Sequence, residues 1–431
     1  MPARFDPSGP LRGTLRPPAD KSISHRAALI AAMADGVTSI EGYLHSADTG
    51  STLAAIEALG ARVEEADGVA EELRIEGVGL RGAAPASIDV GNAGTLLRLL
   101  PGWLAGQPSG SWELDGDESI RRRPVDRVVE PLRKMGASLS CREDRLPPLS
   151  VEGSPLHGIE YRLPVASAQV KSCVLFAGLL AEGGTRVVEP LPSRDHTERM
   201  LAAAGAEIER QDGAVTVRPT ERLAPGRIVV PADFSSAAFF IVAALLVDGS
   251  EVEIRQVGLN PTRTGLLAIL ERMGARVNVE PEGDRGGEPV GRVVARASAL
   301  QGVEVGGAEV PLAIDELPLV ALAACFAEGT TAIGDAAELR RKESDRIETV
   351  TAALTALGGR VEATEDGMVV EGGGGLRGGA VDSGGDHRVA MLGAIAGLAS
   401  REGVEVEGMG AAAISYPGFE ADLASLIGSG G

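Results

Sequence analysis

One pattern of apolar and polar positions recurs along the chain: an amphipathic helix, a Gly-Ala or Gly-Gly pair, and a short strand. A glycine at that point is typical of a helix that ends in the left-handed conformation and leads into a strand. Successive copies lie roughly 70 residues apart, which is the spacing of a structural repeat. The pattern predicts helices that end at Gly60, Gly136, Gly205, Gly274 and Gly358, and a sixth copy that turns at Gly428.

A second pattern alternates with the first: a cluster of small or polar residues, an apolar helix, a glycine and a strand of alternating polarity. Together the two patterns predict six copies of a unit with two helices and several strands, close to β-α-β-α-β-β. The second pattern predicts helices that begin at residues 21–22, 92–95, 167–169, 233–236, 315–316 and 386–388.

The length of the chain decides how these copies are divided. Because 431 residues exceed one typical core, we expect an α/β (α+β) protein of two domains with three repeats each. Pro231, between the third and fourth copies, is a natural crossing point between domains. If the repeats share one orientation, the polar clusters lie at the N-termini of buried helices, whose partial positive charge attracts anions.

The first helix start, residues 20–26, places Lys21, His25 and Arg26 ahead of an apolar helix. We expect Ser22 to be the N-cap, with Arg26 one turn further along the same face. This arrangement would hold a phosphate or a carboxylate, but an ordinary capped helix with a solvated basic first turn shows the same pattern. A repeat protein whose helices are merely capped needs only Ser, Asp and Asn there, so the added basic residues favour an anion site.

Composition narrows the choice of partner. The formal net charge of -20 and an aromatic content of 3% disfavour nucleic acid, so an anion site must be a local concentration of positive charge. Lysine is scarce in this chain, and arginine makes up nearly all of the 41 lysine and arginine residues. A lysine kept against that bias indicates a place that needs a compact ammonium, except at Lys134, which only complements a helix end. The four lysines are Lys21, Lys134, Lys171 and Lys342.

The remaining composition points to a cytoplasmic, soluble protein. The three cysteines are widely separated, which indicates neither a disulfide framework nor a zinc site. The longest apolar run, residues 239–247, is about half the length of a membrane span. The five histidines are scattered and no carboxylates have the spacing of a metal cage, so we expect no metal and no membrane.

Further motifs carry charge at the other helix starts. Two glycines in residues 91–95 would let a ligand approach backbone N–H groups, and Arg98 lies one turn inside. Residues 121–123 are three adjacent arginines, either a solvated loop or a clamp for a phosphate or carboxylate. Ser167 and Lys171 share one helical face at the third start.

The densest charge lies at residues 340–346. Lys342 and Arg346 are like charges at helical spacing, which is unfavourable unless an anion or nearby acids such as Glu343 relieve it. Asp315 and Glu343 are candidate general acid and base groups, because no serine or cysteine has the partners of a catalytic triad. Two anion pockets and two carboxylates suggest a reaction between two anionic substrates, with a proton transfer and no cofactor.

Over essentially the whole chain these motifs resemble the 5-enolpyruvylshikimate-3-phosphate synthases. The resemblance implies two domains of three β-α-β-α-β-β repeats, the inside-out α/β barrel of the enolpyruvyl transferases. It places one domain, on the shikimate-3-phosphate side, at residues 20–231, and a discontinuous one, with much of the phosphoenolpyruvate site, at 1–19 plus 232–431. The matching motifs are residues 20–26, 91–95 with Arg98, 123–124, 167–169, Asp315, 342–346 and 386–388.

The resemblance also implies roles for residues and a reaction. The carboxyvinyl group of phosphoenolpyruvate would pass to the 5-hydroxyl of shikimate-3-phosphate by addition and elimination, in chorismate biosynthesis, in a monomer whose domains close. Lys21, Asp315 and Glu343 would be catalytic, with Glu343 at the methylene carbon and Asp315 at the 5-hydroxyl. Shikimate-3-phosphate would be bound by Lys21, Ser22, Arg26, Ser167, Ala168, Gln169, Arg194, Asp315 and Lys342. Phosphoenolpyruvate would be bound by Lys21, Asn92, Gly94, Arg123, Gln169, Arg346, His387 and Arg388.

Departures from the family pattern concern the inhibitor glyphosate. Ala168, His196 and Ile414 resemble the tolerant branch of the family, whereas that branch has alanine where this chain has Gly94. We expect the smaller Gly94 to leave room for glyphosate, which would then compete with phosphoenolpyruvate.

Two alternatives remain beside this interpretation. A related transferase acts on UDP-N-acetylglucosamine, but it typically has a cysteine in the loop that corresponds to residues 115–121, where none occurs. A non-catalytic anion-binding repeat protein would share the helix starts without needing Glu343. The related RNA-phosphate cyclase architecture is disfavoured by the acidic net charge.

Overall fold

The computed structural model describes residues 2–65 and 72–427, so the predicted turn at Gly428 lies outside the described residues. The chain divides into two compact units, each with its own hydrophobic core. Unit 1 is Met1–Pro18, Ala232–Gly283 and Pro289–Gly431, and unit 2 is Ala19–Pro231 and Asp284–Glu288. The predicted assignment of shikimate-3-phosphate to one domain and of much of the phosphoenolpyruvate site to the other stays a prediction.

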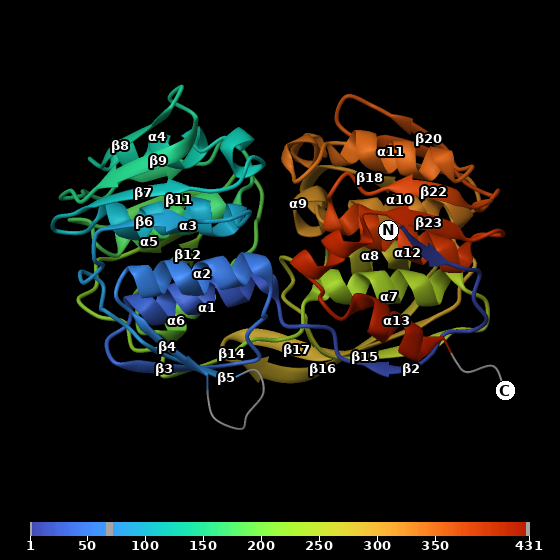
Figure 1. Cartoon of the computed structure of the whole chain (residues 1–431), viewed down its shortest axis with the longest axis horizontal. Coiled ribbons are helices and arrows are strands. Elements are labelled where there is room, and N and C mark those ends of the chain that lie inside the picture. The colour runs from blue at the N-terminus through green and yellow to red at the C-terminus, as the bar shows by residue number, and fades with distance from the viewer. Residues whose placement is uncertain (1, 66–71, 428–431) are drawn as a thin grey trace. The chain divides into compact units, whose positions relative to one another are not determined.

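Unit 2 contains three four-stranded sheets in its described residues. Figure 1 labels strands of each sheet. In each sheet the first two strands are parallel and the other pairs are antiparallel, so all three share one topology. The first sheet is β14 (Arg227–Val229), β3 (Val37–Glu41), β5 (Glu72–Glu76) and β4 (Arg62–Glu65). The second is β6 (Ala86–Asp89), β7 (Ser111–Asp115), β9 (Leu146–Glu152) and β8 (Ser138–Arg142). The third is β10 (Glu160–Arg162), β11 (Thr185–Val188), β13 (Ala214–Val217) and β12 (Ile208–Gln211).

Unit 1 repeats this plan, with one three-stranded sheet among its described residues. One sheet is β16 (Arg276–Arg285), β17 (Glu288–Arg296), β15 (Glu251–Gly258) and β2 (Arg12–Leu15). Another is β18 (Glu304–Val305), β19 (Thr330–Ile333), β21 (Met368–Glu371) and β20 (Arg360–Ala363). The smallest is β1 (Ala3–Phe5), β23 (Val404–Glu407) and β22 (Gly379–Asp382). Among residues 2–65 and 72–427 the sheets are separate, and their strands do not close into one barrel.

Strand pairing explains why the chain crosses between units. β2 pairs in parallel with β15, so the start of the chain completes a sheet of unit 1. β14, the last strand of unit 2 before residue 232, pairs in parallel with β3 and completes the sheet of the first repeat. Each unit thus finishes one sheet with a strand that is distant in sequence.

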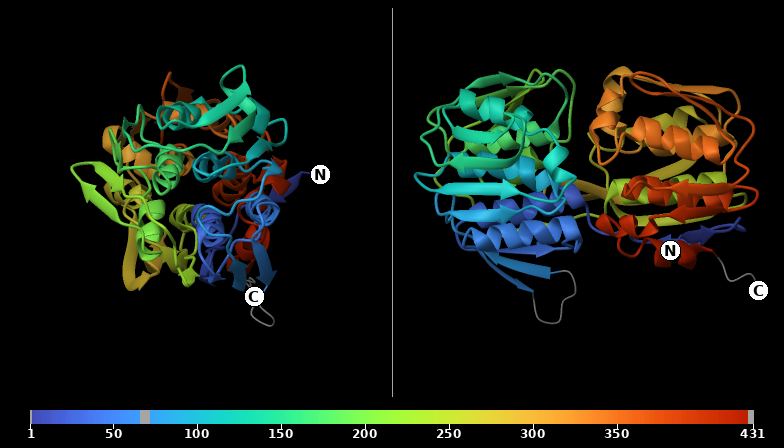
Figure 2. Two further views of the ribbon diagram at one scale, coloured as in Figure 1. Left: turned by 90° about the vertical axis from the view of Figure 1, so that its left-hand side faces the viewer. Right: turned by 45° about the horizontal axis from the view of Figure 1, so that its top comes forward.

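Two classes of helix follow the two sequence patterns. α1 (Lys21–Met33), α3 (Gly94–Ala105) and α5 (Ala168–Gly178) are almost entirely buried in unit 2, as are α7 (Phe234–Leu246), α10 (Leu317–Phe326) and α12 (His387–Ala399) in unit 1. Beyond their polar first turns these helices are largely apolar on all sides, which allows other elements to surround them. Figure 2 (left) views the helices of unit 2 end on.

The other helices bury one face and leave the opposite face in solvent. They are α2 (Ala47–Ala58), α4 (Asp126–Lys134), α6 (His196–Ala203), α8 (Gly265–Arg272), α11 (Arg346–Ala356) and α13 (Phe419–Leu426). The predicted glycine ends are confirmed, because Gly60, Gly136, Gly205, Gly274 and Gly358 have φ values between 82° and 103°. The short elements are α9 (Val310–Ala313) and the 3-10 turns η1 (Ile120–Arg122), η2 (Gly307–Glu309), η3 (Ala337–Arg341) and η4 (Met409–Ile414).

One feature of the division was not predicted: residues Asp284–Glu288, at the tip of the β16–β17 hairpin, group with unit 2. Glu288 Oε1 lies 2.8 Å from His196 Nδ1, and Arg199 Nη1 donates to the Gly287 carbonyl at 2.9 Å. These contacts join residues some 90 positions apart, which sequence periodicity does not reveal. Within the described residues, no helix is long and apolar enough to cross a membrane.

Candidate active site

The first helix start of unit 2 is capped differently from the prediction. Asp20, not Ser22, is the N-cap of α1, and its carboxylate accepts from the Ile23 N–H at 2.8 Å. The helix therefore begins at Lys21, one residue before the predicted cap. An acidic cap satisfies a free N–H group and also complements the positive helix end, which favours Asp20.

Lys21 and Arg26 extend from this helix start in two different environments. Lys21 is half-buried, and its Nζ lies 3.0 Å from Asp48 Oδ2, in the first turn of α2. Arg26 is buried, and it donates to Thr197 Oγ1 at 2.7 Å, to Ser172 Oγ at 3.0 Å and to the Ser22 carbonyl at 2.9 Å. The Arg26 guanidinium thus joins the starts of α1, α5 and α6.

His25, the third basic residue of this helix start, is neutral. It is fully buried, and its Nδ1 lies 2.6 Å from Thr52 Oγ1. Burial lowers the pKa of His25 from 6.5 to about 3, against the raising effect of the Asp48 carboxylate. The basic character of this helix start therefore comes from Lys21 and Arg26.

The starts of α3 and α5 are joined by side chains. Arg98 Nη1 donates to Gln169 Oε1 at 3.0 Å, and Gln169 Nε2 donates to Thr95 Oγ1 at 3.1 Å. Ser167 is the N-cap of α5, where its hydroxyl accepts from the Val170 N–H at 3.4 Å, and Ala168 is the first residue of that helix. Three helix N-termini therefore gather at one end of unit 2, where an anion would meet free N–H groups.

Arg123 lies against the loop that leads into α3. Its Nη2 donates to Asn92 Oδ1 at 2.8 Å and to Ser119 Oγ at 3.2 Å. A Cβ added at Gly94 would lie only 2.8 Å from Arg123 Nη1, so the glycine allows this close approach. The three adjacent arginines do not act together, because Arg121 pairs with Asp115 and Arg122 with Glu118.

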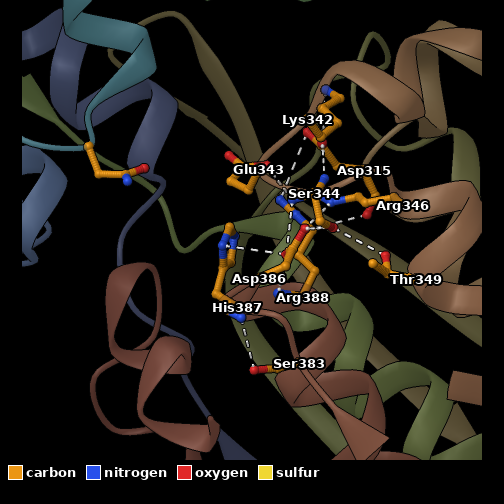
Figure 3. Close-up of polar contacts among 12 residues, drawn as sticks. Asp315, Lys342, Glu343, Ser344, Arg346, Thr349, Ser383, Asp386, His387 and Arg388 are labelled. Atoms are coloured by element: carbon orange, nitrogen blue, oxygen red, sulfur yellow. Dashed lines mark hydrogen bonds and ion pairs between the residues drawn. The ribbon is translucent and has the colours of Figure 1, made fainter. Parts of the chain in front are cut away.

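The charged cluster of unit 1 is centred on Arg346 (Figure 3). This buried guanidinium donates to Glu343 Oε2 at 2.6 Å, to Asp386 Oδ2 at 2.9 Å and to Asp315 Oδ1 at 3.2 Å. Burial alone would lower the pKa of Arg346, but the three carboxylates outweigh this effect and raise the pKa above its usual range. Arg346 is thus a permanent cation that holds two candidate acid/base groups in place.

Asp315 lies among three cations. Lys342 Nζ and Arg346 Nη1 are each 3.2 Å from Asp315 Oδ1, and Arg388 Nη2 is 3.8 Å from Oδ2. Arg388 Nη1 also donates to the Asp315 backbone carbonyl at 3.2 Å. The prediction that Lys342 and Arg346 lie one helical turn apart is wrong, because α11 begins only at Arg346 with Asp345 as its N-cap. The shared carboxylate of Asp315 balances the two like charges instead.

Asp386 lies at the predicted helix start of residues 386–388, and no role in the site was predicted for it. It is the N-cap of α12, where it accepts from the Arg388 N–H at 2.9 Å, and it also accepts from Ser344 Oγ at 3.0 Å. Burial would raise the pKa of Asp386, but the Arg346 guanidinium overcomes that effect and lowers the pKa. The capping pattern was visible in the sequence, whereas the long-range contact with Arg346 was not. His387, also buried, has Nδ1 3.9 Å from Asp386 Oδ1.

One grouping has the composition of a metal site. Ligand atoms of Asp195, His196 and Glu288 lie within 4.8 Å of one another in buried positions. Protein groups already engage these atoms, since His196 bonds to Glu288 and the Asp195 carboxylate accepts from Arg199 and Arg210, each at 2.8 Å. The contacts fit a structural hydrogen-bond network better than a cation site.

Comparison with known proteins identifies the chain's relatives. The family model of EPSP synthase (3-phosphoshikimate 1-carboxyvinyltransferase) matches residues 5–423. The chain belongs to this family. It is 50% identical to the 3-phosphoshikimate 1-carboxyvinyltransferase of Geobacter sulfurreducens over 97% of each chain. It is 49% identical to the Synechococcus enzyme of that name over 98% of this chain and 96% of the relative.

Solved structures agree with this family assignment. The EPSP synthase of Acinetobacter baumannii superposes with a TM-score of 0.87 at 42% identity, covering 99% of this chain and 98% of the other. The enolpyruvyl transferase NikO of Streptomyces tendae shares the fold, with a TM-score of 0.78 at 19% identity, over 98% of this chain and 96% of its own. The predicted α/β fold and the family resemblance are therefore confirmed.

Proposed function

We propose that the protein transfers the enolpyruvyl group of phosphoenolpyruvate to the 5-hydroxyl of shikimate-3-phosphate and releases phosphate. Family membership supports this reaction, and one observation in the structure carries it. Arg346 holds the carboxylates of Asp315 and Glu343 side by side, among cations that would attract an anionic substrate. A protein that only bound anions would have no need for two acids within that cluster.

Shikimate-3-phosphate would be held mainly by the helix starts of unit 2. Lys21, Arg26 and Arg194 would supply positive charge, and the N-termini of α1 and α5 would supply N–H donors to its phosphate and carboxylate. Hydrogen bonds of Arg26 to neutral oxygens of Thr197 and Ser172 orient the guanidinium without cancelling its charge. The proposed ligands are Lys21, Ser22, Arg26, Ser167, Ala168, Gln169, Arg194, Asp315 and Lys342.

The proposed ligands of phosphoenolpyruvate are Lys21, Asn92, Gly94, Arg123, Gln169, Arg346, His387 and Arg388. Its carboxylate and phosphate match the guanidinium groups in shape and charge. Arg346 already contacts three carboxylates, so a substrate anion would have to replace at least one of them.

The reaction would proceed in two balanced steps. In the addition step, Glu343 would give a proton to the methylene carbon of phosphoenolpyruvate while the 5-hydroxyl oxygen bonds to C2 and loses its proton to Asp315. The product is a tetrahedral phosphoketal with a methyl group. In the elimination step, that methyl group would return a proton to Glu343 as the C–O bond to phosphate breaks, which restores the carbon–carbon double bond. Asp315 would pass the proton of the 5-hydroxyl to the departing phosphate, so both carboxyl groups return to their starting states.

A substrate anion that displaces Glu343 from Arg346 would prepare Glu343 to donate a proton to the methylene carbon. A cation 2.6 Å away stabilises the negative form of a carboxylate and opposes its protonation. If the substrate carboxylate takes the place of Glu343 at Arg346, Glu343 can accept the proton that the addition step requires. Substrate binding and proton transfer would then be linked through one guanidinium.

Phosphate release tests the proposal directly. The purified protein is given shikimate-3-phosphate alone, phosphoenolpyruvate alone, both together, or phosphoenolpyruvate with UDP-N-acetylglucosamine. We expect phosphate only when shikimate-3-phosphate and phosphoenolpyruvate are present together. Release with the nucleotide sugar would favour the related transferase, and release with neither acceptor would leave only an anion-binding role.

A further inference from the structure

Lys171, one of the four lysines, has no place among the proposed substrate ligands. It lies one turn inside α5 and is fully buried. Its Nζ is 2.7 Å from Glu198 Oε1, 2.8 Å from Glu189 Oε2 and 3.4 Å from the Ser193 carbonyl oxygen. The ammonium donates hydrogen bonds to Glu189 and to the Ser193 carbonyl, and it forms an ion pair with Glu198.

The three partners of Lys171 belong to a single stretch of chain. Glu189 follows β11, Ser193 precedes Arg194, and Glu198 lies in the first turn of α6. Ser193 Oγ also donates to Glu189 Oε1, so the same loop is bonded to itself at the place where Lys171 contacts it. The ammonium therefore fastens both ends of residues 189–198, the stretch that carries Arg194, to the start of α5.

A neighbouring contact shows that Arg26 depends on the same junction. Ser172 follows Lys171 in the chain, and Thr197 precedes Glu198. Their hydroxyl oxygens, Ser172 Oγ and Thr197 Oγ1, lie 2.7 Å apart. Both accept hydrogen bonds from Arg26, at 3.0 Å and 2.7 Å. A shift of α6 away from α5 would therefore move the partners of Arg26 as well as the loop of Arg194.

The chemistry of the site explains a lysine in a chain that otherwise uses arginine. A compact ammonium places three donors around one atom, whereas a planar guanidinium spreads five donors and needs more room in a fully buried position. The carboxylates of buried Glu198 and largely buried Glu189 also require a cation, because a carboxylate out of water is unfavourable without one.

We propose that Lys171 is a positioning residue that fixes residues 189–195, and with them Arg194, at the anion site of unit 2. The proposal rests on the proposed function, in that the anion is the phosphate-bearing substrate. Lys171 contacts no substrate itself; it determines how tightly shikimate-3-phosphate is bound and leaves phosphoenolpyruvate unaffected.

Hydrogen exchange without substrate tests the placement independently of the reaction. In Lys171→Met the side chain keeps its length and loses its charge, so we expect backbone amides of residues 189–195 to exchange about tenfold faster. Lys134→Met is the matched control, because Lys134 is an exposed lysine of the same unit that pairs with Glu130. Unchanged exchange at 189–195 in Lys171→Met would overturn the proposal.

Steady-state kinetics and titration with shikimate-3-phosphate test the consequence. For Lys171→Met we expect the KM and Kd for shikimate-3-phosphate to rise about 10- to 100-fold, with the KM for phosphoenolpyruvate within twofold of wild type. An equal rise for both substrates would show a general structural defect and overturn the proposal. A wild-type protein that fails to bind shikimate-3-phosphate would refute the proposed function, while the exchange experiment would still decide whether Lys171 fixes the loop.

A second variant covers the case in which Lys171→Met does not fold. Lys171→Met with Glu198→Gln removes one buried carboxylate along with the cation, which leaves Glu189 and its hydrogen bond from Ser193. We expect the same selective loss of shikimate-3-phosphate affinity. Wild-type affinity in this double variant would contradict the role assigned to Lys171.

Discussion

The helix starts of the two units are built from similar parts but differ in what their arginines contact. In unit 2, Arg26 and Arg123 donate to hydroxyl, amide and carbonyl oxygens, which are neutral. In unit 1, Arg346 is surrounded by the carboxylates of Asp315, Glu343 and Asp386.

Neutral partners orient a guanidinium and leave its charge for a ligand, whereas carboxylate partners neutralise it until a ligand displaces them. This difference between the arginine partners suggests that the two clusters have different functions. The cluster of unit 2 is suited to holding a strongly anionic substrate, and the cluster of unit 1 is suited to exchanging partners and moving protons.

The largest effect is expected at Glu343. In Glu343→Gln the amide oxygen can still accept from Arg346, but no proton can be given to the substrate carbon. We expect kcat to fall about 100- to 10,000-fold, with the Kd for shikimate-3-phosphate within threefold of wild type. Phosphate release and titration calorimetry measure the two quantities. The control is Glu338→Gln, since Glu338 pairs with the exposed Arg341; turnover retained in Glu343→Gln would remove Glu343 from the chemistry.

A comparison of two buried arginines tests the contrast through stability. Arg346→Met leaves three carboxylates without their shared cation, and we expect the free energy of unfolding to fall by about 3–5 kcal/mol. Arg26→Met leaves neutral oxygens without a donor, for which we expect a loss of about 1–3 kcal/mol. Urea denaturation of both variants at pH 7.5 provides the values. Equal losses would mean that the partners of the two arginines are not energetically different.

A smaller effect is expected from Gly94→Ala. The new Cβ would lie 2.8 Å from Arg123 Nη1 and 3.3 Å from Arg98 Nη1, so both flexible side chains must move. We expect the KM for phosphoenolpyruvate to rise about tenfold, and inhibition by glyphosate to weaken if the inhibitor occupies the same space. Gly50→Ala is the control, because a Cβ there meets nothing within 4 Å. Unchanged kinetics in Gly94→Ala would show that Arg123 does not contact the substrate.

The smallest effect concerns His25, which lies beside the charged start of α1 but is neutral. Its folded pKa of about 3 is below the ordinary value of 6.5, so the unfolded chain binds more protons between these pH values and stability falls as the pH drops through that range. From pH 7.5 to 5.5 this group should cost about 1 kcal/mol of unfolding free energy. In His25→Gln the difference between the two pH values should shrink by that amount. If His25→Gln loses as much unfolding free energy between pH 7.5 and 5.5 as the wild type does, a group other than His25 causes the acid sensitivity.

The sequence predicted the features that repeat and missed those that depend on distant contacts. The ends at Gly60 and its equivalents follow local rules, so their left-handed φ values could be anticipated. Asp48 was missed because it meets Lys21 only after α2 folds back on α1. Asp386 was recognisable as part of a helix start, but its bond to Arg346 spans 40 residues.

Burial also decides charge in ways that a motif does not show. His25 sits within a basic motif, yet packing leaves it uncharged. Lys171 shares a helical face with Ser167 in the sequence, but its ammonium is directed into the contact between α5 and α6. In both cases the motif was correctly located, and the tertiary environment determined the role of the side chain.

In the reaction that we propose, proton transfer in the cluster of unit 1 forms an intermediate with a methyl group. The most direct measurement is the deuterium content of the product's enolpyruvyl methylene group when wild-type protein turns over in D2O. Addition adds one deuteron to the methylene carbon, and elimination then removes one of three hydrogens from the methyl group. The account predicts substantial deuterium in the methylene group of the product. A product with no deuterium at that carbon would contradict it.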